Sequence, residues 1–439
     1  MSGTTILISP LNWGFGHAGR MIPLAVELKE RGSDVVFGAD TQILPLIEQE
    51  LPGIRLIEIP GLHIRYSRFL PQYLCIFLQL PVLVISAFRE HFALRRIVRE
   101  INPAVIISDN RFGFFHPRIP SVYVTHQLRI PFPRSLRFME PFTAWLHRKI
   151  INRYDLCLVP DYPGEVNLSG RLSHGLNLSV DMSGRLSQRL KAPVNLPGRL
   201  SHGLKVPVNL PGRLSQRLKV PANVHYMGPL SRFRTAAPSE AAITPCHPYC
   251  CLILSGPEPQ RTMLLEQVAA ALPGIQLCVL SAAPVKMIPG NDPFLTLIIR
   301  PCSGTMRQHI EGSSLVITRA GYTSVMELVS LEKGAVLIPT PGQPEQEYLG
   351  DWLNNHHGFI TVKQQNIGSL RALAERFMTD TVLNEIPSPQ LPDNVTEVGN
   401  SPPQLSDAVP AVTNSSPQLP DGTGLFEQAI SLLLEQKKQ

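Results

Sequence analysis

The sequence of 439 residues is poor in charged side chains and in cysteine. Charged residues make up 17% of the chain and hydrophobic residues 44%, a balance that excludes a disordered or fibrous protein and favours buried cores. Seven cysteines are an odd number in a long chain, so we expect reduced thiols and no disulfide framework. No basic segment precedes the short apolar run at residues 6–8, which argues against a signal peptide and predicts a cytoplasmic protein.

Long hydrophobic runs are also scarce, and residues 68–91 form the segment closest in length to a membrane span. This segment is apolar over about twenty positions, near the minimum for a transmembrane helix. Two prolines and two glutamines interrupt it: Pro71, Pro81, Gln72 and Gln79. We therefore expect an ordinary buried helix pair. The first alternative is a surface helix facing a membrane or an acceptor, which would place the protein peripherally at the inner face of the membrane. A transmembrane helix is the least favoured interpretation.

The sequence offers no convincing metal site. The tightest group of potential ligands is Cys246, His247, Cys250 and Cys251. Cys250 and Cys251 open an apolar run typical of a strand, so their side chains should point to opposite faces and not share one ion. A convincing D-x-D pattern is also missing. We therefore expect neither a metal nor a cofactor.

The net charge of +6 comes from one repeated segment. Four units of 14 residues begin at Asn167, Asp181, Asn195 and Asn209, and the last ends at Ala222. They hold nine Lys or Arg and one Asp, a balance of +8, so the rest of the chain carries −2. The segment has no aromatic residue for base stacking, and we expect no nucleic acid as partner. The basic charge describes the repeat and says little about the folded domains.

A second repeat near the end of the chain has the same period. Gln390, Gln404 and Gln418 recur 14 residues apart in Pro- and Ser-rich surroundings. Two unrelated sequences expanded at one period indicate duplication of short DNA segments rather than a solenoid, whose units are usually longer. We interpret residues 167–222 as an interdomain linker and residues 385–424 as a flexible repeat, followed by a C-terminal helix at 425–439.

Outside the repeats, short apolar strands alternate with helices. Strands are expected at residues 4–10, 33–40, 103–109, 121–127 and 155–161, and again at 249–256, 275–281, 295–301, 314–321 and 335–341. Helices are expected at 18–32, at 259–272, from Tyr322 and at 345–355. Two successive runs of this kind predict an α/β protein with two Rossmann-like parallel-sheet domains, residues 1–166 and 223–384, facing a cleft.

The first candidate site is the glycine-rich turn at residues 9–20. Gly14 and Gly16 allow close backbone approach, and the following helix offers free N–H groups to an anion or a sugar oxygen. The dinucleotide fingerprint would need a third glycine at a spacing that this turn lacks, so NAD is not indicated. His17 stands at the opening of the helix, where strand ends of a parallel sheet form binding sites. Arg20 follows on the same helix.

Two further turns carry candidate residues in the second domain. Gly256 follows a strand, and Gln260, Arg261 and Thr262 open the next helix, which suits a diphosphate or is simply a tight turn. The stronger signal lies at residues 318–353. There Gly321 allows a sharp turn, and Glu327, four residues after Thr323, can accept both hydroxyls of a ribose. The loop at 340–346 adds Gln343, Glu345 and Gln346, side chains that suit sugar hydroxyls.

The pattern R-x-G-x-x-[ST]-x-x-E, an apolar strand ending in Pro and a Gln-rich loop resemble the donor-binding region of GT-B glycosyltransferases. The similarity is greatest to the MurG-like family 28 C-terminal domain, and within it to a group from Bacteroidetes-type bacteria. The motifs shared with that group are "WGxGHAxR" at 13–20, "SDNRxG" at 108–113, "THQ" at 125–127 and "GPLSRF" at 228–233. The resemblance implies a hexosyltransferase that moves a sugar from a nucleotide-sugar, UDP-linked by likeness, to an acceptor hydroxyl.

The resemblance also implies roles for single residues. Glu327 would bind the donor ribose, Gln346 with Glu345 and Glu347 the donor sugar, residues 256–262 the diphosphate, and Arg319 the uridine side. His17 resembles an acceptor-side histidine that acts as base in some relatives, with Asp109 and His126 as rivals because each ends a strand of the first domain. Two departures, "GPEPQRT" at 256–262 and Glu347 in place of a glutamine, leave the sugar open.

Three other functions remain as alternatives. A sugar-nucleotide epimerase shares the two-domain architecture but differs in its opening motif. A non-enzymatic polyanion-binding protein would work through the basic repeat. A sugar-nucleotide sensor would bind the donor without transferring it. The acceptor stays open; the apolar segment at 68–91 suits a lipid-linked or membrane-proximal one.

Overall fold

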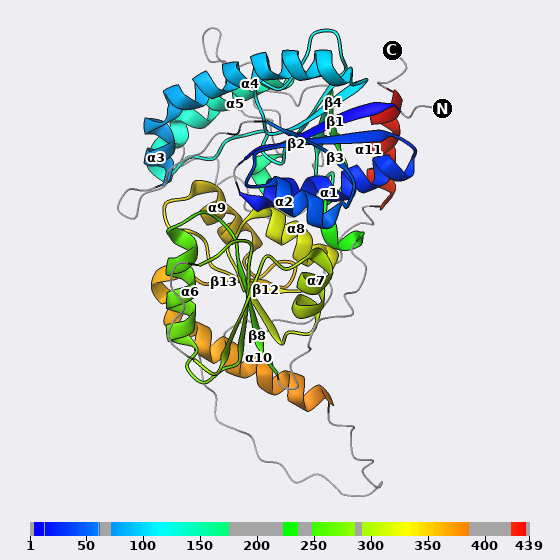
Figure 1. The fold of residues 1–439 in the computed structure, drawn as a ribbon. Coiled ribbons are helices and arrows are strands. Elements are labelled where there is room, and N and C mark those ends of the chain that lie inside the picture. The colour runs from blue at the N-terminus through cyan, green and yellow to red at the C-terminus, as the bar shows by residue number, and fades with distance from the viewer. Residues whose placement is uncertain are drawn as a thin grey trace, which may run out of the picture.

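The computed structural model describes residues 4–12, 14–59, 61, 72–174, 223–235, 248–285, 292–385 and 423–435. These residues form two α/β domains, one above the other in Figure 1, each built around a parallel sheet. The prediction of two Rossmann-like parallel-sheet domains is confirmed. The second repeat lies almost wholly outside the described residues, and the first is described only over residues 167–174.

The sheet of the N-terminal domain has seven parallel strands in the order β3-β2-β1-β4-β5-β6-β7. Their bounds are β1 (Thr5–Pro10), β2 (Asp34–Ala39), β3 (Arg55–Glu58), β4 (Val105–Asp109), β5 (Ser121–Val124), β6 (Leu156–Val159) and β7 (Val224–Tyr226). The two edge strands β3 and β7 are only partly buried and carry no apolar run, so the sequence does not reveal them. Because β7 pairs with β6, residues 224–226 extend the first sheet, whereas the boundary expected at residue 223 places them in the second domain.

The sheet of the C-terminal domain has six parallel strands in the order β10-β9-β8-β11-β12-β13. Their bounds are β8 (Cys250–Leu254), β9 (Leu277–Ser281), β10 (Leu295–Ile299), β11 (Leu315–Thr318), β12 (Ala335–Leu337) and β13 (Phe359–Thr361). Cys250 and Cys251 open β8 and are buried in separate clusters on its opposite faces, as the strand pattern predicts. Among the described residues, no group of three or more His, Cys, Asp or Glu side chains is placed to hold a metal ion.

Helices cover both faces of each sheet. In the first domain these are α1 (Phe15–Glu30), α2 (Leu44–Glu50), α3 (Gln72–Leu78), α4 (Leu80–Ile101) and α5 (Glu140–Ile151), with short 3₁₀ turns η1 (Arg134–Met139) and η2 (Gly170–Leu172). In the second they are α6 (Gln260–Ala271), α7 (Ser303–Glu311), α8 (Tyr322–Ser330), α9 (Pro344–Leu353) and α10 (Leu370–Glu385), with η3 (Arg232–Arg234) before and η4 (Gln364–Ser369) within them. Alternate residues of each central strand enter different cores, so Ile6 packs under α1 and Leu7 under α4.

The last helix, α11 (Thr423–Glu435), returns to the first domain. Phe426, Ala429, Ile430 and Leu433 are buried in the core cluster that α1 forms with β1 and β2. In Figure 1 this helix, coloured red, lies beside the blue strands of the N-terminal domain. The two ends of the described chain therefore share one hydrophobic core.

The apolar segment at 68–91 is described from residue 72 onward, as α3 and the first half of α4. Its large side chains face outward: Phe77, Leu78 and Phe88 are 60%, 63% and 64% exposed. The expectation of an ordinary buried helix pair is wrong for this face, because α4 buries only the residues that contact the sheet, such as Leu94 and Ile97. Among the described residues, no helix combines the length and the hydropathy that crossing a membrane requires.

Candidate functional site

Four side chains predicted from the sequence meet where the strands of the first sheet end: His17, Arg20, Asp109 and His126. β1 and β4 are neighbours in register, so Asp109 at the end of β4 lies beside the turn that leads into α1. His17 stands in the first turn of α1, and Arg20 lies one turn later on the same face. Nδ1 of His17 is 2.8 Å from Oδ2 of Asp109, and Arg20 donates to Oδ1 of the same carboxylate.

Burial and charge set the protonation of this group. Burial lowers the pKa of His17, and the guanidinium of Arg20 lowers it further, against the opposing effect of Asp109. Burial alone would raise the pKa of Asp109, but Arg20 and His17 outweigh it and hold this pKa below its ordinary value. At neutral pH the structure therefore favours a neutral imidazole beside an ionised carboxylate. Nη2 of Arg20 also lies 2.8 Å from Nδ1 of His17, so this nitrogen has both an acceptor and a donor beside it. In the tautomer whose Nδ1–H donates to Asp109, Nε2 of His17 has a lone pair that can accept a proton.

His126 extends the cluster into the second domain. Arg20 can only donate, so Nδ1 of His126, 3.0 Å from it, accepts, and Nε2 donates to Glu345 at 2.8 Å. The ring also stacks on Tyr322, the first residue of α8, at 4.2 Å between centroids. Both nitrogens of His126 are engaged, which makes it a connector between the domains and a weaker candidate for the base than His17.

The glycine-rich turn touches the second domain directly. A Cβ at Gly16 would lie 3.0 Å from Oγ1 of Thr323, so a larger residue there would press on the first turn of α8. Gly14 has a positive φ of 91° and open space around it. The predicted acceptor-side turn and the predicted donor helix are thus neighbours, although 307 positions separate Gly16 from Thr323 in the sequence.

Glu327 is buried on α8 and paired within the chain. Its Oε1 accepts from Nε of Arg232 at 2.8 Å, and a Cβ at Gly19 would be 3.8 Å away. Burial raises the pKa of Glu327, while Arg232 opposes the rise. A ribose at this carboxylate would have to share it with Arg232. That arginine lies in the "GPLSRF" motif, which offered the only sequence signal for it.

The Gln-rich loop uses most of its side chains to hold its own shape. Gln346 accepts from the backbone N–H of Thr340 at 2.9 Å, and Glu347 from that of Gly342 at 2.8 Å. Gln343 is the residue that precedes α9 and contributes backbone bonds. Glu345 differs, because its carboxylate contacts His126 of the other domain. Burial alone would raise the pKa of Glu345, but His126 helps to hold this pKa below its ordinary value.

The remaining donor-side candidates have structural partners. Arg319 is buried and donates to the carbonyls of Ile338 and Gln260 and to Oε1 of Gln364, so its guanidinium braces β11 against neighbouring loops. Gly321 precedes α8 and has open space beside it. The first turn of α8 carries no side-chain cap, so its N–H groups stay available to an anion.

The turn before α6 is closed by its own carboxylate. Arg261 bonds to Oε1 of Glu258 at 2.8 Å, and Oε2 of Glu258 accepts from the N–H of Thr262. Gly256 has a positive φ of 90° and open space around it. Oε1 of Gln260 and Oγ1 of Thr262 are buried without a hydrogen-bond partner. The sequence predicts the diphosphate at the start of α6, whereas the start of α8 is the more open of the two helix starts.

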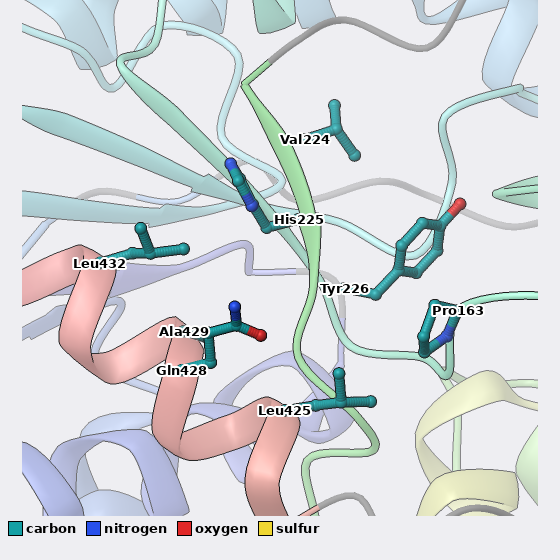
Figure 2. A pocket seen from close by; sticks show the side chains of 8 residues that line it. All are labelled: Pro163, Val224, His225, Tyr226, Leu425, Gln428, Ala429 and Leu432. Carbon is teal, nitrogen blue, oxygen red and sulfur yellow. The ribbon is translucent and has the colours of Figure 1, made fainter.

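A pocket of about 240 Å³ lies elsewhere, between the edge strand β7 and α11 (Figure 2). His225 and Tyr226 line it from the strand side, and Leu425, Gln428 and Leu432 from the helix. None of the predicted site residues lines it.

The comparisons agree with this geometry. Residues 290–380, from just before β10 into α10, match the model of the glycosyltransferase family 28 C-terminal domain. The solved structure of CalG4, the calicheamicin glycosyltransferase, shares 13% identity over 88% of this chain and 92% of its own, with a TM-score of 0.51. The spinosyn forosaminyltransferase SpnP shares 12% sequence identity over 86% of this chain and 91% of its own, with a TM-score of 0.50. A MurG from Acinetobacter baumannii shares 12% sequence identity over 98% of this chain and 99% of its own, with a TM-score of 0.48.

No curated protein matches the chain in sequence. The structural likeness establishes the two-domain GT-B fold, and the segment that matches family 28 contains Arg319, Glu327 and the Gln-rich loop. The comparisons therefore show a glycosyltransferase family 28 C-terminal domain at residues 290–380 within a chain of GT-B fold.

The buried pair of Arg232 and Glu327 gives a test of stability. In Arg232→Met, Glu327 remains buried without its cation, so its pKa rises further and the free energy of unfolding falls by about 3–5 kcal/mol at pH 8. The folded state then takes up a proton more readily than the unfolded state, so stability decreases as pH rises and the deficit shrinks toward pH 5.

Urea denaturation at both pH values measures this effect. Arg371→Met, which breaks the exposed pair with Glu375, is the control and should cost less than about 1 kcal/mol. An equal deficit for Arg232→Met at pH 5 and pH 8 would contradict the assignment of a buried charge pair.

Proposed function

We propose that the protein transfers a sugar from a nucleotide-sugar to an acceptor hydroxyl, with His17 as the general base. The observation that carries this proposal is the contact of Nδ1 of His17 with the buried carboxylate of Asp109, 2.8 Å away. We assign the proton of the neutral imidazole to Nδ1, because the ionised carboxylate can only accept it, and Nε2 is then free to take a proton. Asp109 orients the imidazole and stabilises the imidazolium that forms. Arg20, buried between Asp109 and His126, holds the arrangement in place.

In the proposed step, Nε2 of His17 removes the proton of the acceptor hydroxyl as its oxygen attacks the anomeric carbon. The bond between that carbon and the phosphate oxygen breaks, and the nucleoside diphosphate leaves with the electron pair. We propose that the uncapped N–H groups of α8, beside Gly321, stabilise the leaving charge without a metal. The proximity of Thr323 to Gly16 supports this, because it brings α8 next to the turn that carries His17.

Donor binding is proposed for the same helix and the loop before α9. Glu327 would accept ribose hydroxyls in competition with Arg232, and Glu345 and Gln346 would contact the sugar. Glu345 is the best supported of the loop residues, since its carboxylate already lies against the base cluster through His126. UDP as the nucleotide rests on the family resemblance.

The acceptor is proposed to be lipid-linked or to lie at a membrane surface. The outer face of α4 presents Ile85, Phe88 and Phe92 to solvent. Exposed arginines on the same helix include Arg89 and Arg95, and cations next to aromatic side chains suit the anionic headgroups of a bilayer. Exposed aromatic residues on η1 and α5, among them Phe138, also belong to this domain.

The base assignment predicts a particular pH dependence. The lowered pKa of His17 keeps the base form populated down to below pH 6.5, so turnover should be flat above that value and fall only in more acidic solution. His17→Ala should reduce kcat by about 10²–10⁴-fold. Asp109→Asn removes a charge that raises the pKa of His17, so kcat falls and the acidic limb moves to lower pH.

Release of nucleoside diphosphate as a function of pH measures both effects. His126→Gln, which keeps an amide between Arg20 and Glu345, is the matched variant and should retain the pH profile. If His126→Gln loses the acidic limb while His17→Ala keeps it, the base has been misassigned.

Donor binding is tested by the melting temperature in a panel of nucleotide-sugars. A ligand at one hundred times its Kd stabilises the folded state by about 2.7 kcal/mol. We expect UDP-sugars to raise the melting temperature most, Glu327→Gln to lose the rise, and the surface variant Glu375→Gln to keep it. A larger rise with another nucleotide would contradict the UDP assignment. An epimerised sugar formed without acceptor would replace the transferase proposal with the epimerase.

Association with membranes is tested by cosedimentation with vesicles. Phe88→Ser combined with Phe92→Ser should reduce binding to vesicles that contain anionic phospholipid by at least about tenfold, because two exposed aromatic rings no longer enter the interface. The control is Phe294→Ser, because Phe294 is exposed and lies in the second domain, just before β10. Equal binding of both variants would exclude the α4 face as the membrane contact.

A further inference from the structure

The first eight residues of the repeat are a buried connection between the two domains. Residues 167–174, "NLSGRLSH", contact residues that follow β5 and β6 of the first domain and residues of α9 in the second. Leu168, Ser169, Leu172 and Ser173 are each fully buried. An insertion with no structural role would not bury both its apolar and its polar side chains.

On the side of the first domain, a buried carboxylate binds the segment. Asp161 accepts from the N–H groups of Leu168 and Ser169, both at 2.9 Å, and from the hydroxyl of Ser169. The carbonyl of Leu172 accepts from the N–H groups of Leu128 and Arg129, at 2.8 and 3.0 Å. Side chain and backbone groups of the first domain therefore recognise this segment together.

On the side of the second domain, α9 supplies two aromatic rings. The N–H of Arg171 donates to the hydroxyl of Tyr348 at 2.7 Å, and its guanidinium lies 4.6 Å from the centre of that ring. The same guanidinium donates to Glu140 of the first domain at 3.1 Å. Arg171 thus touches both domains at once.

Gly170 is required where it stands. Its φ is +53°, and a Cβ there would lie 2.2 Å from the hydroxyl of Tyr348 and 2.8 Å from the ring of Trp352. No other residue type fits this approach without displacing α9. The segment is therefore recognised through a glycine, an arginine and two buried leucines.

Most of these features recur in the other repeat units. The sequence Gly-Arg-Leu-Ser stands at 170–173, 184–187, 198–201 and 212–215, and Leu168 is matched by Met182, Leu196 and Leu210. The units differ at the position of Ser169. The second unit has Ser183, whereas the third and fourth have Pro197 and Pro211, which lack both the N–H and the hydroxyl that bind Asp161.

We propose that Asp161, Glu140, Leu128, Tyr348 and Trp352 form a binding site for the repeat motif, and that the second unit, residues 181–188, is an alternative occupant of it. Moving the motif by one unit lengthens one connecting loop by 14 residues and shortens the other, which costs little because loop entropy changes slowly with length. The second unit loses the bonds that Nδ2 of Asn167 donates to two exposed carbonyls, since Asp181 cannot donate. It keeps all three donors to the carboxylate of Asp161, whereas the third and fourth units lose the two that Ser169 supplies.

The inference is independent of the catalytic proposal, and deletions test it. Deleting residues 167–180 joins Val166 to the second unit, and deleting 167–194 joins it to the third. A chain with residues 167–222 replaced by a Gly/Ser linker of equal length gives the melting temperature of the protein with an empty site. We expect the first deletion to melt within about 2 °C of the full chain, and the second to melt several degrees lower, near the linker variant.

Two substitutions make the test specific to the motif. Pro197→Ser in the chain lacking 167–194 should recover most of the lost melting temperature, because it restores both donors to Asp161. Gly184→Ala should leave the melting temperature of the full chain unchanged. In the chain lacking 167–180, the same substitution should lower the melting temperature at least to that of the second deletion. The proposal is overturned if the linker variant melts with the full chain, if the first deletion melts with the linker variant, or if Gly184→Ala has no effect in the first deletion.

Discussion

The ion pair between Arg20 and Asp109 is the interaction on which the arrangement of the two domains depends. Both side chains are almost completely removed from solvent, so neither charge is tolerable without the other. Once paired, Asp109 presents an oxygen to His17 and Arg20 presents a nitrogen to His126. The pair therefore fixes two imidazoles at the end of the first sheet.

His126 connects this cluster to the second domain. Its ring stacks on Tyr322 and its Nε2 bonds to Glu345, so the start of α8 and the start of α9 are held against the first domain by one side chain. The tautomer follows from Arg20, which cannot accept a hydrogen bond. Carboxylates elsewhere in the second domain are satisfied in the same way: Glu327 by Arg232 and Glu258 by Arg261. If the proposed donor binds at these residues, it must displace some of these internal partners, and donor binding would then be coupled to the contact between the domains.

Much of the fold follows from local sequence. Buried central strands such as residues 105–109 are continuous apolar runs, and the helices between them begin and end at turn residues. The sequence does not reveal the edge strands β3 and β7, because a strand at the edge of a sheet is only partly buried and needs no continuous apolar run. The outward face of α4 is misjudged for a related reason: an apolar run has the same composition whether its outer face meets protein or solvent. The first repeat unit is likewise underestimated, since its Gly and Ser residues suggest a linker until Asp161 and Tyr348 are seen to bind them.

The sequence by itself determined the two parallel sheets, the positions of the glycine-rich turns, and the candidates His17, Asp109 and His126, because each follows from residues close together in the chain. Only the tertiary structure decided how these candidates divide their roles. Asp109 and His126 lie 92 and 109 positions from His17, and Glu345 lies 219 from His126. Whether an imidazole nitrogen is free, or a carboxylate already neutralised, depends on partners at such separations, and no local pattern encodes them.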